Sequence, residues 1–154
     1  MHCDHNASAE QLMQIAEQRC RDEKVRFTPI RRRVFELISA TPSGLKAYEL
    51  LDKLAVDHAS ARPPTVYRAL EFLMEQGLVH RIESLNAFIA CPCPEPNPSH
   101  RSGFQLVICR RCGRVEEMHE PQVNELLAEL VGRHGFSLER QTIELSGVCG
   151  DCRE

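Results

Sequence analysis

Apolar residues recur every three or four positions through the first half of the chain, which is the spacing of one buried helix face. Three of the four runs begin at a residue type that favours a helix start, a capping serine or threonine or an early proline, and the third follows a break at Ser43-Gly44. Gly77 ends the last of these runs. The pattern predicts four helices, which start near Ser8, Thr28, Ala47 and Pro63.

The spacing of apolar residues changes after Gly77. Leu78–Ile82 and Ala87–Ala90 are short apolar segments separated by turn-forming residues, a pattern typical of two paired strands. Several helices followed by a small hairpin indicate a winged helix-turn-helix. We therefore interpret residues 1–90 as a winged-helix DNA-binding domain.

Residues 91–103 contain four prolines, which remove backbone donors and fix φ, so this stretch is expected to be a hinge or long loop. Beyond it the apolar pattern predicts two strands, a helix and a third strand. These elements are Phe104–Cys109, Val115–Met118, Pro121–His134 and Gln141–Val148. Residues 104–154 are therefore expected to form a small α/β dimerisation domain, which makes the whole chain an α+β protein.

The helix expected at residues 121–134 has a broad apolar stripe that so small a domain buries poorly by itself. The stripe consists of Val123, Leu126, Leu127, Leu130 and Val131. Pairing with a second copy of the chain would cover it. We therefore expect a homodimer.

Two Cys-x-x-Cys pairs mark the second domain, Cys109 with Cys112 and Cys149 with Cys152. Four thiolates that reach one point suit a tetrahedral zinc ion. The alternatives are two disulfides or a thioredoxin-like redox pair. A redox pair opens a helix in a βαβ unit, whereas these pairs lie at the ends of predicted strands. We interpret the four cysteines as a structural zinc site.

The net charge of −3 gives no general attraction to nucleic acid, but basic residues cluster within residues 19–33. Arg31, Arg32 and Arg33 in this cluster are candidate phosphate contacts, and a solvated helix face is the alternative. The chain begins without an apolar signal segment and has no run of membrane-spanning length. We expect a cytoplasmic protein with no membrane partner, whose eight cysteines stay reduced and serve as metal ligands.

The helix that starts at Pro63 has polar side chains near its N-terminus, among them Thr65, Tyr67 and Arg68. In a DNA major groove Arg68 can donate two hydrogen bonds to a guanine edge, and Tyr67 can meet a thymine methyl or a phosphate. Thr65 and the helix N-terminus suit a phosphate oxygen. An ordinary exposed helix face would have the same composition, so the chemistry alone leaves both readings open.

Four motifs, in order along nearly the whole chain, resemble those of the ferric uptake regulator family. They are Arg26–Val34, Pro63–Leu70, Gln76–His80 and Cys109–Gly113. Within the family, the stretches 63–76 and 79–84 are most similar to the zinc uptake regulator branch. The resemblance implies a dimeric, metal-dependent transcriptional regulator with an N-terminal winged helix and a C-terminal dimerisation domain.

The same resemblance implies a second, regulatory zinc site, with ligands at the positions of His80, Cys91, His100 and Glu117. Mixed nitrogen, sulfur and oxygen ligands suit zinc, and ligands drawn from both domains would couple zinc binding to domain posture. Cys93 is an alternative to Cys91. Apart from the resemblance, His2, Cys3, His5 and His119 could add a weaker site, and we favour the alternative of a mobile terminus that merely binds stray metal.

Iron and peroxide sensors of the family usually carry His-x-Asp-His just before the first Cys-x-x-Cys. The corresponding stretch here, residues 100–109, lacks that motif, which favours zinc over iron. An iron-, manganese- or peroxide-sensing relative stays the alternative within the family. Outside it, a thiol redox protein or a zinc store remains possible.

The resulting hypothesis is a zinc-responsive repressor of zinc-uptake genes. It would bind a pseudo-palindromic operator in double-stranded DNA as a homodimer, with two zinc ions per subunit, one structural and one regulatory. We expect no enzymatic activity and no small-molecule substrate, because the sequence offers no open zinc site with a general base such as His-Glu-x-x-His.

Overall fold

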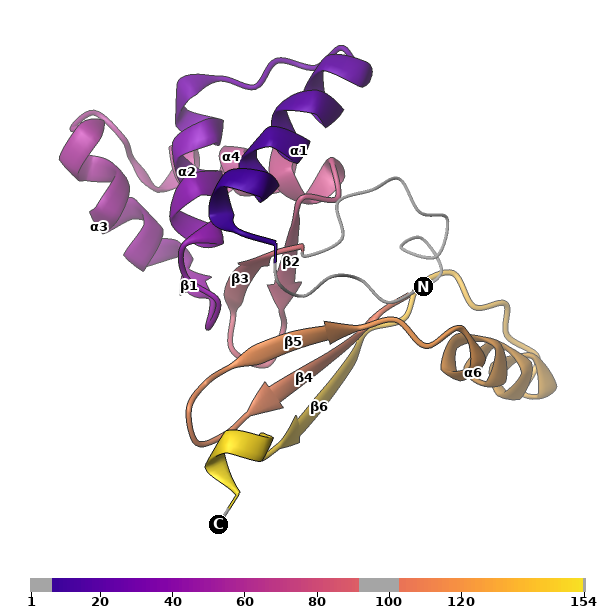
Figure 1. The fold of residues 1–154 in the computed structure, drawn as a ribbon. Coiled ribbons are helices and arrows are strands. Elements are labelled where there is room, and N and C mark those ends of the chain that lie inside the picture. Colours follow the sequence, from indigo (N-terminus) through magenta and orange to yellow (C-terminus); the bar gives the residue numbers. More distant parts are fainter. Residues whose placement is uncertain (1–6, 92–102, 154) are drawn as a thin grey trace. The chain divides into compact units, whose positions relative to one another are not determined.

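A computed structural model of the chain describes residues 7–91 and 103–153. These residues fall into two compact units, one for each of the two ranges (Figure 1). Each unit contains both helices and strands, so the prediction of an α+β protein is confirmed. Cys93, His100, His2, Cys3 and His5 lie outside the described residues.

The first unit contains the four helices that the sequence predicts. The Ser8 hydroxyl accepts the Gln11 N–H at 3.2 Å and the Gln11 side chain accepts the Ser8 N–H at 2.8 Å, so the predicted capping box is present. Thr28 caps the second helix. The bounds are α1 Ala9–Asp22, α2 Pro29–Ser39, α3 Ala47–Asp57 and α4 Pro63–Glu75.

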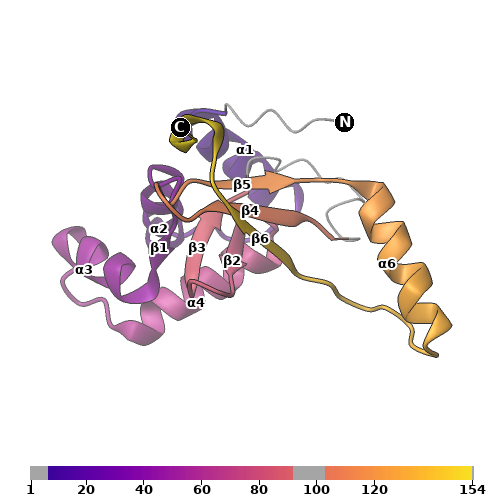
Figure 2. The ribbon, with the colours of Figure 1, turned by 90° about the horizontal axis from the view of Figure 1, so that it is seen from below.

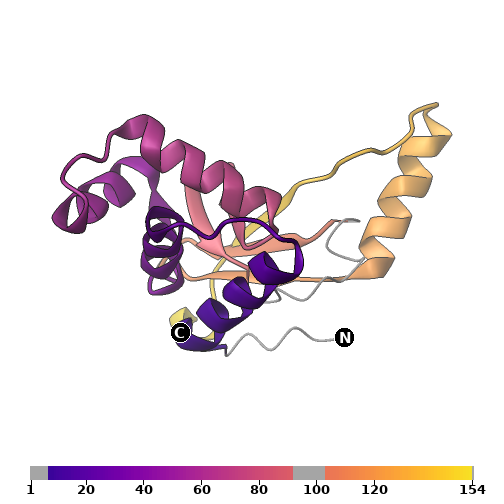
Figure 3. The same cartoon turned by 90° about the horizontal axis from the view of Figure 1, so that it is seen from above.

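The apolar faces of these helices form one core. Helix α2 packs against α1, α3 and α4, as Figure 3 shows for the indigo-to-pink part of the chain. The buried side chains are mostly aliphatic at helical spacing, with one aromatic ring among the largest. They include Phe35, Ile38, Leu50, Leu54, Leu70 and Leu73. This packing holds α4 by one face and leaves its opposite face exposed.

A small antiparallel sheet completes the first unit. The predicted hairpin is present as β2 (Val79–Ile82) and β3 (Ala87–Ala90), and β1 (Leu45–Lys46) adds a third strand in the order β1-β3-β2. Strand β1 was not predicted, because a strand of two residues has no readable period. Four helices with this sheet confirm the winged helix-turn-helix.

The second unit is a three-stranded sheet with one α-helix. Strand β4 is central, antiparallel to β5 and parallel to β6, and Figure 2 shows the three side by side in orange to yellow. A 3-10 turn, η1, follows β6 near the chain end. The bounds are β4 Gln105–Cys109, β5 Val115–Met118, α6 Pro121–Arg133, β6 Ile143–Gly147 and η1 Gly150–Cys152.

Helix α6 is attached to this sheet by amide hydrogen bonds. The Gln105 side chain on β4 donates to the Asn124 side chain at 2.9 Å and accepts the Glu120 N–H at 3.0 Å, where α6 begins. Asn124 is the buried residue of the helix, whereas Leu126 and Leu130 are exposed. Within the described residues no member of the predicted apolar stripe is fully buried, since Val123, Leu127 and Val131 are half-buried.

None of the described helices has the length and apolar composition that crossing a membrane requires.

Candidate metal and nucleic-acid sites

The four cysteines of the two Cys-x-x-Cys pairs come together at one end of the second unit. Cys109 is the last residue of β4, and Cys149 lies just beyond the end of β6. Because β4 and β6 are parallel neighbours, with Cys109 in register with Gly147, their ends bring the two pairs side by side. Tight turns then direct Cys112 and Cys152 back towards the same point: the N–H of Gly113 donates to the Cys109 carbonyl at 2.9 Å, and Gly113 takes a φ of 74°.

The geometry of this cluster fits a zinc ion. The four sulfur atoms all lie within 4.8 Å of one another, and Cys112 Sγ is 3.7 Å from Cys149 Sγ. A tetrahedral ion with zinc–sulfur bonds of about 2.3 Å needs sulfurs roughly 3.8 Å apart, whereas a disulfide needs about 2.05 Å. The six described cysteines are all free thiols, and neither pair opens an α-helix. The arrangement therefore favours a metal over the disulfide and redox alternatives.

The surroundings of the cluster favour a thiolate at Cys109 and a protonated thiol at Cys152. The N–H of Cys149 donates to the Cys109 sulfur at 3.4 Å, and with the N–H groups of Cys112 and Arg111 it lowers the pKa of Cys109 to about 5. The thiol of Cys152 hydrogen-bonds to the neighbouring sulfurs, first of all Cys149, which raises its pKa to about 12. Without metal the cluster therefore shares protons, which zinc would displace on binding.

A second pair of candidate ligands lies on the wing of the first unit. His80 is on β2, opposite Ile89, and the N–H of Cys91 donates to the Leu78 carbonyl at 2.9 Å just after β3. This register places His80 and Cys91 diagonally on the same sheet face, and their ligand atoms lie within 4.8 Å. Cys91 is fully buried. The structure thus brings together two of the four residues predicted as regulatory ligands.

The other described member of that predicted set, Glu117, belongs to the second unit. It lies on β5, its carboxylate is buried, and its Oε1 is 2.7 Å from the Nε2 of His119. The remaining predicted ligand, His100, lies outside the described residues, as does Cys93, the alternative to Cys91. The four-ligand regulatory set therefore stays a prediction.

Helix α4 exposes the residues predicted to meet DNA. Tyr67 is 53% exposed and Arg68 is exposed beside it, and within the described part of the chain neither makes a hydrogen bond or an ion pair. Thr65 is half-buried, and its hydroxyl accepts the N–H of Arg62 at 3.1 Å, so it also stabilises the start of the helix. Tyr67 and Arg68 are available to an external partner.

The three consecutive arginines of α2 differ from Arg68 because each already has a partner within its unit. The Arg31 guanidinium lies 3.7 Å from the centre of the Phe72 ring, and Arg32 pairs with Glu17. Arg33 bridges α2 to α3.

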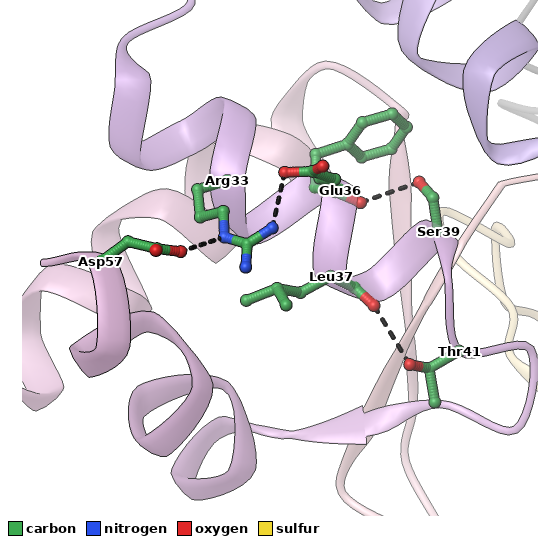
Figure 4. A network of polar contacts seen from close by, with 7 residues as sticks. Arg33, Glu36, Leu37, Ser39, Thr41 and Asp57 are labelled. Atoms are coloured by element: carbon green, nitrogen blue, oxygen red, sulfur yellow. Dashed lines mark hydrogen bonds and ion pairs between the residues drawn. The ribbon is translucent and has the colours of Figure 1, made fainter.

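Figure 4 shows this bridge, in which Arg33 lies between Asp57 and Glu36 at 2.7 Å from each carboxylate. The hydrogen bond that Arg33 donates to the Glu36 carboxylate is the main cause that raises the pKa of Arg33. The phosphate contacts expected of these arginines stay a prediction. To bind them, a phosphate would have to compete with the partners that the arginines already have.

Comparison with known sequences gives a consistent result. The model of the ferric uptake regulator family matches residues 22–146. The zinc uptake regulation protein of Escherichia coli (strain K12) is 40% identical over 147 residues, which cover 96% of this chain and 84% of that protein.

Two solved structures are similar over most of the chain. A zinc uptake regulator complexed with zinc and DNA matches with a TM-score of 0.87 and 37% identity, over 96% of this chain and 96% of that chain. The crystal structure of holo XcZur matches with a TM-score of 0.81 and 38% identity, over 91% of this chain and 95% of that chain.

Proposed function

We propose that the chain, which belongs to the ferric uptake regulator family, is a zinc-responsive transcriptional repressor. It binds operator DNA as a homodimer when zinc is plentiful and acts in the cytoplasm on genes of zinc uptake. The observation that carries this proposal is the similarity of almost the entire chain to a zinc uptake regulator complexed with zinc and DNA. As a regulator of this family, it is not an enzyme.

The four-cysteine cluster holds the structural zinc ion. All four ligands belong to the second unit and lie at the ends of two neighbouring strands, so zinc there fastens β4 to β6 and the chain terminus. Four sulfur ligands complete the tetrahedron and leave no open position for chemistry. This ion stabilises the unit whether or not the cell is rich in zinc.

A second zinc ion serves as the signal. Its ligands in this proposal are His80 and Cys91 from the first unit, with Glu117 and His100 from the second part of the chain. His80 and Cys91 support it because they already share one face of the wing sheet. Because the ligands belong to both parts of the chain, zinc binding would restrict how the two parts are oriented, and a zinc-dependent orientation changes DNA affinity.

DNA is bound through α4 in the major groove. Arg68 reads a base edge and Tyr67 makes an apolar or phosphate contact, which the exposure of both side chains supports. Thr65 with the N-terminus of α4 lies against a phosphate. Arg31, Arg32 and Arg33 add phosphate contacts only to the extent that they exchange their internal partners.

The second unit forms the dimer. The exposed Leu126 and Leu130 of α6, together with the cross-strand pair Val107 and Leu145, give this unit apolar side chains that a second copy can cover. A homodimer presents two α4 helices, so the operator is expected to be pseudo-palindromic, with half-sites about one helical turn or a multiple of it apart.

The direct test is DNA binding as a function of buffered free zinc, with protein that retains its structural zinc. Affinity for a palindromic fragment from a zinc-uptake promoter should rise by about 5- to 150-fold as zinc per chain goes from one towards two. A scrambled fragment of equal length controls for non-specific binding. Unchanged operator affinity after the second zinc has bound would contradict the proposal, as would a response to iron or manganese but not to zinc.

A further inference from the structure

His119 is a histidine for which the proposed function has no role, although it touches one of the proposed ligands. It lies two residues after Glu117, so in extended backbone both side chains point to the same face. Its Nε2 is 2.7 Å from Glu117 Oε1, and only 8% of the His119 side chain is exposed. A buried contact this short fixes both groups.

The direction of this hydrogen bond follows from the chemistry of the two groups. In its ionised form, which is the form that ligates a metal, the Glu117 carboxylate only accepts hydrogen bonds, so Nε2 is then the donor to Oε1. The contact is therefore an orienting bond from a histidine to a carboxylate. Carboxylates that ligate metals are commonly held by such a neighbour, which sets the direction of the oxygen atoms before the metal arrives.

The His119 ring is itself held in place by neighbouring residues. Its centroid lies 6.3 Å from that of Phe104, at an interplanar angle of 55°. Phe104 precedes Gln105, whose side chain is fastened to Asn124 on α6 and to the backbone of Glu120. Glu120 follows His119 directly, so the Gln105 side chain also holds the backbone next to the histidine.

We propose that His119 is the positioning residue of the regulatory zinc site: it orients the Glu117 carboxylate for zinc and is not itself a ligand. The inference rests on the proposed function, because it takes Glu117 as a zinc ligand. It adds a residue on which the zinc threshold depends and which the sequence suggests only for a separate, weaker site.

Two substitutions separate orientation from packing. His119→Gln keeps an N–H donor for Glu117, whereas His119→Phe fills the space and keeps a ring against Phe104 but cannot donate. Zinc affinity of the second site, measured by competition with a chelator on protein that retains structural zinc, should fall about 10- to 100-fold in His119→Phe. The zinc affinity of His119→Gln should stay within a few-fold of that of the unchanged protein, because the glutamine still donates a hydrogen bond, although a less well aligned one.

X-ray absorption at the cobalt edge, with Co²⁺ in the second site and zinc in the first, counts the imidazoles bound to the metal. The count should be the same in the unchanged protein and in His119→Phe. Loss of one imidazole would make His119 a ligand and overturn the inference, and so would an unchanged zinc affinity in His119→Phe. Thermal unfolding of both variants checks that the second unit stays folded.

Glu117→Ala distinguishes failure of the inference from failure of the proposed site. If Glu117→Ala leaves zinc affinity unchanged, Glu117 is not a ligand, and the proposed regulatory set is wrong along with the inference. If Glu117→Ala weakens zinc binding, adding His119→Phe to it should cause no further loss. A further loss of tenfold or more would mean that His119 acts by another route and would overturn the inference alone.

Discussion

The two sets of candidate zinc ligands differ in how they are distributed along the chain. The four cysteines belong to one unit and are gathered by two parallel strand ends, with their sulfurs within 4.8 Å. The proposed regulatory set would draw His80 and Cys91 from the first unit and Glu117 from the second. A site complete within one unit can only stabilise that unit, whereas ligands shared between two units make zinc occupancy depend on how those units are oriented.

The same contrast separates the arginines. Arg33 joins α2 to α3 through carboxylates on both sides, while Arg68 on α4 has no partner within the described residues. Side chains with partners inside their unit support the fold, and side chains without such partners are available to DNA.

The largest effect is expected from the four-cysteine cluster. Cys112→Ser should remove the structural zinc and unfold the second unit, because structural zinc sites contribute ~10–16 kcal/mol of apparent binding free energy at pH 7. Zinc content and circular dichroism measure this loss, and operator binding should disappear with it. Cys20→Ala, which removes a buried thiol of the first unit, should keep its zinc. A Cys112→Ser protein that stays folded and zinc-loaded would show that the cluster is not the structural site.

The wing ligands should have a smaller and different effect. Cys91→Ser or His80→Ala should leave the fold and the first zinc intact but remove the zinc response, so operator affinity at high zinc falls about 5- to 150-fold. Fluorescence anisotropy with labelled operator measures it. His58→Ala, a histidine at the end of α3 outside the ligand set, is the matched control. A normal zinc response in both wing variants would leave the signal site unassigned.

Arg68→Ala should weaken operator binding by ~1–3 kcal/mol, roughly 5- to 150-fold, without changing zinc affinity or stability. The comparison that matters is operator against random DNA of the same length. A loss on the operator alone assigns Arg68 to a base edge. An equal loss on both would reduce its role to a DNA-backbone contact. The slope of log affinity against log salt concentration would then be smaller by about one, the share of one phosphate.

The smallest effect is expected from Arg33→Ala. Partly exposed ion pairs contribute about 0.2–1 kcal/mol, so the free energy of unfolding of the first unit should fall by less than that upper value. Urea denaturation measures this change, and Asp57→Ala should match it. If Arg33→Ala instead weakens DNA binding several-fold while Asp57→Ala does not, Arg33 leaves its internal partners to bind phosphate.

The sequence was sufficient to predict the elements that depend on local chemistry. The capping box at Ser8 and the strands Ala87–Ala90 and Val115–Met118 are present as expected. The end of α6 differs from its prediction by one residue, because helix ends are set by fraying and capping rather than by the apolar period. The cysteine cluster was also predictable, since each pair needs only one tight turn.

The features that could not be predicted from the sequence depend on which residues lie close together in the folded chain. Strand β1 forms because Leu45 and Lys46 pair with β3 from a distant part of the chain. The internal partners of Arg31, Arg32 and Arg33 involve other helices and turns. A run of basic residues in the sequence therefore does not show whether the arginines have such partners. The contact between His119 and Glu117 depends on the backbone at the end of β5, because the sequence alone does not give the distance between the two side chains.

The central claim is that zinc at the second site and operator DNA favour the same state of the protein. Thermodynamic linkage makes this effect reciprocal, so the most direct measurement is the zinc affinity of the second site with and without saturating operator. The account predicts that operator tightens zinc binding by the same factor by which zinc tightens operator binding, about 5- to 150-fold. Equal zinc affinity with and without operator would contradict it.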